Sequence, residues 1–156
     1  MCFLISVIGG NSASAEEAGF AAALGGLLAE RGFSVVCGGG GGVMEAVSRG
    51  CSSSGGTVIG ILPGEDSREA NPFVSIPIPT GMGVSRNRII ALSGQAVCAV
   101  GGSWGTLSEI AFALQAGKPV CCHGTWSGIP GVFPVETPED ALAFILKNTE
   151  ERDAQR

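Results

Sequence analysis

The stretch that decides the fold spans residues 33–45 and reads FSVVCGGGGGVME. An apolar run, Phe33–Cys37, leads into five consecutive glycines, Gly38–Gly42, and then into a segment of helical character that starts at Val43. The apolar positions are consecutive rather than alternating, which is typical of a strand buried on both faces in a parallel sheet covered by helices. Strand, glycine-rich turn and helix together predict one β-α unit of such a sheet.

The same pattern recurs on both sides of this stretch. The segment Phe73–Ile78 is rich in β-forming residues but is flanked and interrupted by prolines, so we predict an edge strand or an extended loop there. Strands alternating with helices over short connections predict an α/β fold: a single doubly wound, Rossmann-like domain with a mainly parallel sheet covered by helices on both faces. The further apolar runs that predict strands are Phe3–Ile8, Thr57–Leu62, Ala96–Val100 and Pro119–His123.

Capping residues predict where the helices begin and end. We expect the domain to cover residues 1–148 and a charged, frayed tail to cover residues 149–156. The predicted helices are one from the capping box Ser14–Glu17 to Arg31-Gly32, Val43–Ser54, one capped by Ser85 through about Ser93, one capped by Thr106 through about Ala116, and one from Thr137-Pro138 to about Lys147.

Composition and charge exclude several classes of protein. Glycine makes up 26 of the 156 residues, but without a three-residue period, and 45% hydrophobic against 15% charged residues indicates a packed core rather than disorder. The formal net charge is −5 and the Lys and Arg residues are scattered, which argues against a nucleic-acid partner. No apolar run approaches a membrane span. Six cysteines without a C-x-x-C pair, and a single histidine, predict no metal site and a reducing cytoplasm.

The glycines that bear on function follow the carboxyl ends of the predicted strands. Gly9–Ser12, Gly38–Gly42 and Gly101–Gly105 each follow a strand, so in a parallel sheet they share one rim. Backbone N–H groups and helix N-termini at such a rim suit a phosphate or a similar oxyanion. Tight turns also use glycine without any ligand, but five consecutive glycines exceed what a turn alone needs.

Three familiar motifs are absent. The chain has no P-loop, and it has no G-x-S-x-G elbow of a hydrolase. The dinucleotide fingerprint G-x-G-x-x-G fails because Val43 takes the third glycine position after Gly38 and Gly40. These absences disfavour NAD-dependent redox chemistry and a Ser-His-Asp triad.

Two charged side chains near the rim admit two interpretations each. Glu109 is spaced to form a capping box with Thr106, or else it is a carboxylate that faces the glycine rim and serves a ligand. Arg86 lies in the first turn of a predicted helix, where a cation opposes the helix dipole, so it belongs either to a functional site or to a surface salt bridge.

Three rings at the predicted rim are also open to interpretation. Trp104 and Trp126 either stack on a heterocycle or fill a contact between subunits, the second being the commoner use. His123 ends a strand, and a hydrogen-bonded structural role fits it better than metal binding.

Four segments together resemble the superfamily once labelled "lysine decarboxylase-like", also called SLOG. They are Gly39–Met44, Asn71-Pro72, Met82–Asn87 and Gly102–Glu109. The superfamily includes the cytokinin-activating "lonely guy" phosphoribohydrolases, the molybdenum-cofactor carrier proteins and the nucleotide-fold part of the DNA-processing protein DprA. The resemblance spans roughly residues 3–147, and the short carrier-like, DprA-related group is the most similar.

The phosphoribohydrolase signature P-G-G-x-G-T-x-x-E is retained in part. Gly102, Gly105, Thr106 and Glu109 match it, whereas Gly101 replaces the proline and Ser103 the second glycine. Arg86 falls on the family's arginine position, and Asn87 replaces the lysine that usually follows it. No lysine context of the kind used by PLP enzymes is present, so the decarboxylase label is not supported.

The resemblance implies two functions, and the tryptophans Trp104 and Trp126 suggest a third; the sequence leaves all three open. The first is a binding or carrier protein for a molybdenum cofactor-like molecule or a nucleotide, with no required cofactor. The second is a nucleoside 5′-monophosphate phosphoribohydrolase that uses Arg86 and Glu109, and the third is a non-catalytic assembly module. A homo-oligomer, dimer or tetramer, is expected in each case. The residues expected to bind the small phosphorylated ligand are Gly10, Asn11, Ser12, Gly39, Gly40, Gly41, Gly42, Met44, Arg86, Asn87, Gly102, Ser103, Trp104, Gly105, Thr106 and Glu109.

Overall fold

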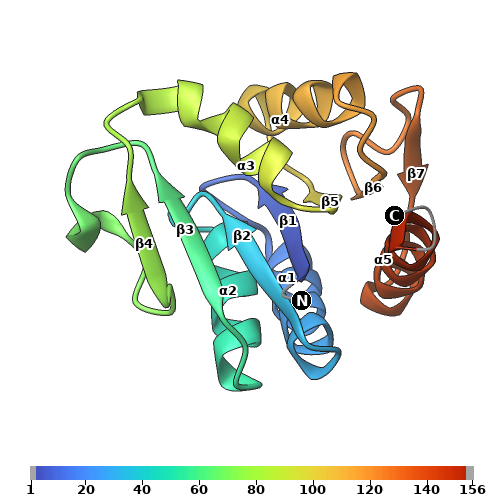
Figure 1. Ribbon diagram of the computed structural model, residues 1–156, viewed down its shortest axis with the longest axis horizontal. Helices are drawn as coiled ribbons and strands as arrows, with labels where there is room; N and C mark the ends of the chain where they lie inside the picture. Colours follow the sequence, from blue (N-terminus) through green and yellow to red (C-terminus); the bar gives the residue numbers. More distant parts are fainter. Residues whose placement is uncertain (1–2, 154–156) are drawn as a thin grey trace.

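A single seven-stranded sheet forms the centre of the protein (Figure 1). The computed structural model describes residues 3–153. All neighbouring strands are parallel, and their order across the sheet is β4-β3-β2-β1-β5-β6-β7. The strands are β1 (Phe3–Gly9), β2 (Phe33–Cys37), β3 (Val58–Leu62), β4 (Ile76–Pro79), β5 (Ala96–Val100), β6 (Val120–His123) and β7 (Val132–Pro134).

The chain builds the sheet in two directions from β1. Strands β2, β3 and β4 are added on one side of β1, and β5, β6 and β7 on the other. The point where the direction reverses lies between β1 and β5, which pair from Ile5↔Ala96 to Gly9↔Val100. This topology is that of a doubly wound α/β fold and confirms the predicted fold class.

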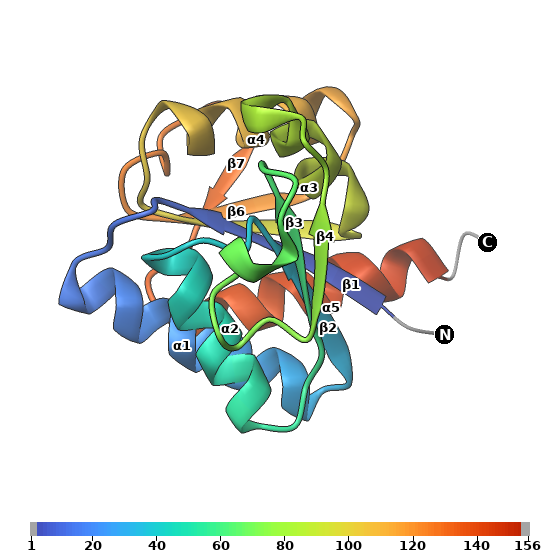
Figure 2. The same ribbon diagram turned by 90° about the vertical axis from the view of Figure 1, so that its left-hand side faces the viewer.

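Helices cover both faces of the sheet (Figures 1 and 2). One layer contains α1, α2 and α5, and the other contains α3 and α4 with the short 3-10 helix η2. Each layer closes its own hydrophobic core, the first around Val7 and Leu24 and the second around Ile90 and Ile110. The helices are α1 (Ala15–Glu30), α2 (Val43–Ser53), η1 (Ser67–Glu69), η2 (Gly83–Arg86), α3 (Asn87–Ser93), α4 (Trp104–Gln115) and α5 (Pro138–Asp153). Within residues 3–153, none of them combines the length and the hydrophobicity that crossing a bilayer requires.

Two predicted helix starts are confirmed by their caps. The Ser14 side chain accepts from the N–H of Glu17, whose carboxylate in turn accepts from the N–H of Ser14. Thr137 and Asp140 make the same reciprocal pair at the start of α5. Each capping box satisfies two backbone N–H groups that the first helical turn leaves free.

Two other predicted caps are wrong. Ser85 lies inside η2, and α3 begins only at Asn87, without a side-chain cap. Thr106 lies inside α4, which begins at Trp104 with Ser103 at the N-cap position and no side-chain cap bond. In both places the chain reaches the helix through a glycine-containing turn, Gly81–Gly83 or Gly101-Gly102, so backbone geometry rather than a side chain sets the start.

The carboxyl-terminal part of the fold differs from the prediction. Strand β7 is absent from the predicted strands: Val132 pairs with Val120, which adds a seventh strand of three residues to the sheet. Helix α5 continues to Asp153 and so includes most of the predicted tail, whose last part, residues 154–156, lies outside the described residues. Strand β4 is an edge strand, one of the two alternatives predicted for Phe73–Ile78, and it covers Ile76–Pro79.

Candidate functional site

Two glycine-rich loops interlock at the carboxyl ends of β1 and β2. The N–H of Val43 donates to the carbonyl of Gly10 at 3.0 Å, and the N–H of Gly41 donates to the Asn11 side chain, also at 3.0 Å. A Cβ on Gly42 would lie only 2.3 Å from the Gly10 carbonyl oxygen. Any side chain at Gly42 would therefore force the two loops apart.

A third glycine segment meets them from β5. A Cβ on Gly10 would lie 3.5 Å from the Cα of Gly102, so the backbones of these loops are close neighbours. The three predicted rim segments converge where the strand order reverses, which is the place where doubly wound sheets bind ligands. Helices α2 and α4 both begin here, so their N-termini add N–H groups and partial positive charge.

The backbone at Gly101 and Gly102 explains one departure from the phosphoribohydrolase signature. Both residues have a positive φ, +53° and +89°. Proline is locked near a φ of −65°, so it cannot occupy position 101 in this conformation. Ser103 has a φ of −120° and therefore needs no glycine.

Asn71 holds the glycine loop in place, a role that sequence reasoning missed. Its backbone N–H donates to the Gly39 carbonyl at 2.8 Å, and its side-chain amide donates to the Gly40 carbonyl at 2.9 Å. Its side-chain oxygen accepts from the N–H of Phe73 at 3.1 Å. In the sequence the Asn71-Pro72 pair contributes only to the family resemblance, because nothing there indicates a partner 31 residues earlier.

Arg86 reaches from η2 toward the glycine loop. Its Nε donates to the carbonyl of Ile61 at 3.0 Å, and its guanidinium also donates to the side-chain oxygen of Asn87. A Cβ on Gly38 would lie 3.0 Å from a terminal nitrogen of Arg86. Burial lowers the pKa of Arg86, and the nearby Glu109 and Cys37 act in the opposite direction. A half-buried guanidinium held in this way is a fixed positive charge beside the loop.

Asn87 connects α3 to α4. Its side chain is buried, and its amide donates to the Ser108 hydroxyl at 3.3 Å. Arg86, Asn87 and Ser108 thus form one chain of hydrogen bonds that fixes the guanidinium relative to α4.

Glu109 is a buried carboxyl group, not a cap. It is the sixth residue of α4, so the predicted capping box with Thr106 is wrong. Its side chain is 6% exposed, and burial raises its pKa to about 8, with Arg86 opposing the rise. Among the described residues, no cation lies within ion-pair distance of it. Thr106 instead packs against Gly102, where a Cβ would lie 2.0 Å from the Thr106 hydroxyl.

The remaining predicted site residues fall into two groups. Met44 is buried beneath the loop, with its sulfur 2.6 Å from where a Cβ on Gly38 would stand. Asn11, Ser12, Ser103 and Gly105 are exposed on the rim. Trp104 is 77% exposed, and its ring lies 5.9 Å from that of Trp126.

His123 is hydrogen-bonded through both ring nitrogens, as expected for a structural histidine. Its Nδ1 lies 3.1 Å from the Val135 carbonyl, to which it must donate, and its Nε2 lies 2.6 Å from the Glu16 carboxylate. The ring stacks on Phe20 at 4.3 Å. His123 therefore ties α1 to the end of β6.

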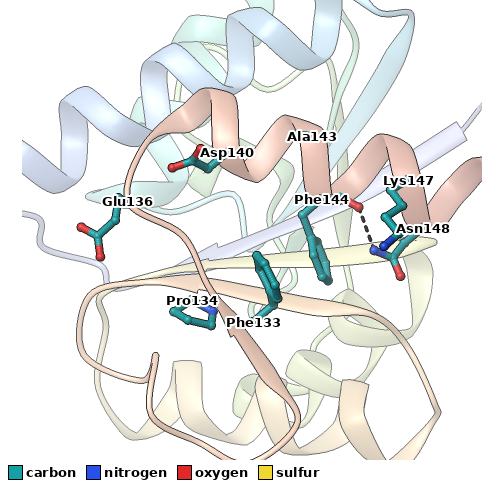
Figure 3. A pocket seen from close by; sticks show the side chains of 8 residues that line it. All are labelled: Phe133, Pro134, Glu136, Asp140, Ala143, Phe144, Lys147 and Asn148. Atoms are coloured by element: carbon teal, nitrogen blue, oxygen red, sulfur yellow. Dashed lines mark hydrogen bonds between the residues drawn. The ribbon is translucent and has the colours of Figure 1, made fainter.

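A groove of about 680 Å³ lies away from this rim, between β7 and α5 (Figure 3). The stacked rings of Phe133 and Phe144, 5.1 Å apart, form one wall. None of the predicted site residues lines the groove. The groove's polar lining comes from Glu136, Asp140, Lys147 and Asn148, whereas the predicted site residues lie at the glycine rim.

The rim has the chemistry of an anion site. It combines closely packed loops, two helix N-termini and one fixed cation, which suit a phosphate group. Beside them lies a carboxyl group that is protonated at neutral pH and can donate a hydrogen bond.

Comparisons with known proteins agree with the resemblance described above. The sequence model of the SLOG cluster4 family matches residues 2–152. An uncharacterized protein of Archaeoglobus fulgidus is 42% identical over 145 residues, which cover 93% of this chain and 95% of that protein.

Solved structures give the same result. The molybdenum cofactor binding protein of Rippkaea orientalis has a TM-score of 0.88 at 34% identity, covering 94% of this chain and 97% of that one. The molybdenum cofactor carrier protein of Chlamydomonas reinhardtii has a TM-score of 0.85 at 32% identity, covering 95% and 99%. DprA from Streptococcus pneumoniae shares the fold alone, at 19% identity and a TM-score of 0.70, covering 92% of this chain and 61% of that one.

Proposed function

The chain belongs to the SLOG cluster4 family, and from this premise we propose that it binds or carries a phosphorylated heterocycle at the glycine rim. Molybdenum cofactor is the leading candidate for the cargo, because similar structures include a molybdenum cofactor binding protein and a carrier protein for it. A nucleotide is the alternative cargo. In this proposal the cofactor is transported and serves no chemistry of the protein's own.

One observation carries the proposal, namely the convergence of three glycine segments on a fixed guanidinium. The backbone of Gly10 lies beside those of Gly42 and Gly102, and Arg86 lies beside Gly38. Backbone N–H groups and helix N-termini bind phosphate through directed hydrogen bonds, and the guanidinium adds charge. Trp104, exposed at the rim, offers a ring face on which a heterocycle can stack.

The first prediction concerns binding and uses two neighbouring arginines. Replacing Arg86 by Gln removes the cation beside the loop, so affinity for molybdopterin or AMP should fall about 10- to 100-fold. The matched control is Arg88→Gln, because Arg88 is exposed and lies over the Phe112 ring instead of the loop. Isothermal titration of the wild type and both variants measures the difference. Equal losses in the two variants, or no affinity of the wild type for any phosphorylated heterocycle, would contradict the proposal.

A second candidate function is hydrolysis of a nucleoside 5′-monophosphate. The observation in its favour is Glu109, a buried carboxyl group with a pKa of about 8 that interacts electrostatically with Arg86. A group protonated at neutral pH can act as a general acid toward a leaving base. The product pair would be the free base and ribose 5-phosphate.

The second prediction separates hydrolysis from binding. If the protein is a hydrolase, incubation with AMP releases adenine, and Glu109→Gln abolishes the release because the amide cannot transfer a proton. The same variant should keep most of its affinity for AMP, since Arg86 and the loops are unchanged. Chromatography of the released base is the measurement. Undiminished turnover by the variant would remove Glu109 from the mechanism, and no turnover by the wild type would leave the carrier function alone.

Two broader expectations complete the proposal. A cytoplasmic location agrees with the five described cysteines, which are all buried free thiols. A nucleic-acid partner is not proposed, because the scattered basic residues and the net charge of −5 offer no electropositive surface.

A further inference from the structure

The groove between β7 and α5 is lined by an exposed pair of aromatic rings (Figure 3). Phe133 on β7 is 53% exposed, and its ring stacks on that of Phe144 on α5. The other exposed large hydrophobic side chains of residues 3–153 all lie between residues 76 and 104. Two stacked rings in a groove of about 680 Å³ form an apolar surface that another molecule can cover.

Charges of opposite sign flank the rings. Glu136 and Asp140 lie at the start of α5, whereas Lys147 lies further along this helix, and Figure 3 shows them on opposite sides of the rings. Lys147 follows Asp140 by seven residues, which corresponds to about 10 Å along the helix axis. In the part of the chain that the structure describes, neither Glu136 nor Lys147 forms an ion pair. Asp140 uses one carboxylate oxygen in its capping box with Thr137.

The spacing of the lining residues suits a helix as the occupant. Asp140, Phe144 and Lys147 are separated by four and three residues, so they form one stripe along α5. A stripe of this kind beside a second wall is the surface into which an amphipathic helix packs. A peptide that adds a strand to the sheet fits less well, because β7 has three residues and ends at Pro134, which has no N–H to donate.

We propose that the groove binds an amphipathic helix of another protein, with an acidic residue near its start, an apolar stripe in its middle and basic residues in its last turn. The basic residues pair with Glu136 and Asp140, the apolar stripe covers Phe133 and Phe144, and the acidic residue meets Lys147. The bound helix runs antiparallel to α5. In this direction its cations lie at its carboxyl end and its acid at its amino end, where the helix dipole favours each of them.

Other occupants fit the charges of the groove less well. A nucleic acid or an anionic membrane would meet two carboxylates, and Lys147 is the only cation among the lining residues. A second copy of this chain on a two-fold axis would bring together two carboxylates for each ammonium group, on molecules that each carry a net charge of −5. A helix with a surplus of cations balances the groove.

The groove and the glycine rim are separate surfaces. None of the residues expected to bind the phosphorylated ligand lines the groove, so a partner helix and a cargo can be bound at the same time. The inference therefore does not depend on the proposed cargo.

The third prediction uses a synthetic helix as the probe. It is an alanine-based peptide of about 15 residues with a glutamate in its first turn, leucines on one face and two lysines in its last turn. Fluorescence anisotropy should show saturable binding of the labelled peptide to the full chain. Phe133→Ser removes one ring and should weaken binding about tenfold. Lys147→Glu turns an attraction into a repulsion and should weaken it about three- to tenfold.

Two controls make this test specific. Arg49→Glu makes the same charge reversal on an exposed arginine of α2, outside the groove, and should bind like the wild type. A second peptide, with its glutamate replaced by lysine, should bind Lys147→Glu more tightly than the wild type, because the ion pair is restored with opposite signs. Lys147 is exposed, so its variant should fold normally, and an unchanged thermal unfolding curve verifies this.

Several results would overturn the proposal. One is the absence of saturable binding at peptide concentrations up to about 1 mM. Another is an equal loss of affinity in Lys147→Glu and Arg49→Glu, or a second peptide that does not distinguish Lys147→Glu from the wild type. A change in the sedimentation of the peptide-free protein caused by Phe133→Ser would assign the groove to a second copy of the chain instead.

Discussion

Glu109, which is buried, and Arg86, which is half-buried, show how removal from water gives a pair of residues its chemistry. Burial favours the neutral form of each group, so it raises the pKa of Glu109 and lowers the pKa of Arg86. The charge of each partner opposes the shift of the other. The guanidinium stays charged because its ordinary pKa is far above neutral. The carboxyl group, with a pKa of about 8, does not. The pair therefore presents one cation and one neutral hydrogen-bond donor, an arrangement suited to an anionic ligand.

The fourth prediction concerns pH and belongs to Glu109. Its pKa is raised from 4.5 to about 8 in the folded protein. Its contribution to stability is therefore complete below pH 4.5 and is lost as the pH rises to about 8, at about 1.4 kcal/mol per pH unit. The neutral variant Glu109→Gln lacks this loss. Urea unfolding between these pH values should show the free energy of unfolding of the variant rising relative to that of the wild type as the pH rises. Parallel curves would show that the carboxyl group is ionised in the folded state.

The sequence indicated these two residues but not their surroundings. Arg86 stood out because a cation at a helix start opposes the dipole, and Glu109 because of its place in the signature. The capping-box spacing, however, also allowed a purely capping role for Glu109. In the structure α4 begins at Trp104, two residues before Thr106, so Glu109 lies in the second turn, beyond the free backbone N–H groups that a cap would satisfy, and it is buried. Asn71 gave no local signal, since its partners are backbone carbonyls far away in the chain.

At the scale of elements, glycine serves two different purposes. At the rim it lets loops approach each other, as in the contact between Gly42 and Gly10. Between α1 and α2 it lets helices approach: a Cβ on Gly50 would lie 1.9 Å from the Ala22 carbonyl oxygen, and one on Gly25 would lie 2.3 Å from that of Val47. The glycine-rich turns in the sequence predicted only the contacts at the rim. The contact between the two helices was not predicted, because a glycine within a helix gives no sign in the sequence of the segment that packs against it.

The fifth prediction compares two glycines of opposite character. Gly102→Ala should destabilise the protein by about 1–3 kcal/mol, because φ is +89° and the new methyl group would collide with Thr106. Gly19→Ala is the control: it lies on the exposed side of α1 with nothing within 4 Å, so alanine should stabilise the helix by about 0.5–1 kcal/mol. Urea unfolding measures both. Equal stability of the two variants would show that the turn at Gly102 relaxes freely.

At the scale of the whole molecule, the sequence predicted the central strands of the sheet better than the strands at its edges. Consecutive apolar runs identified the central strands, because burial on both faces leaves a strong pattern. Strand β7 has no such pattern, because it consists of only three residues and ends at Pro134. It is recognised as a strand only through the pairing of Val132 with Val120. The strand order also could not be seen locally, although it brings residues 10, 42 and 102 together.

If the rim binds an anion as proposed, the way in which Asn11 and Asn71 hold the glycine loop affects the entropy of that binding. Five free glycines would sample many conformations, and ordering them costs about 1–2 kcal/mol per residue. Here the carbonyls of Gly39 and Gly40 and the N–H of Gly41 are already bonded to the two asparagines. The loss of chain entropy therefore accompanies folding, and the loop is already ordered before an anion binds.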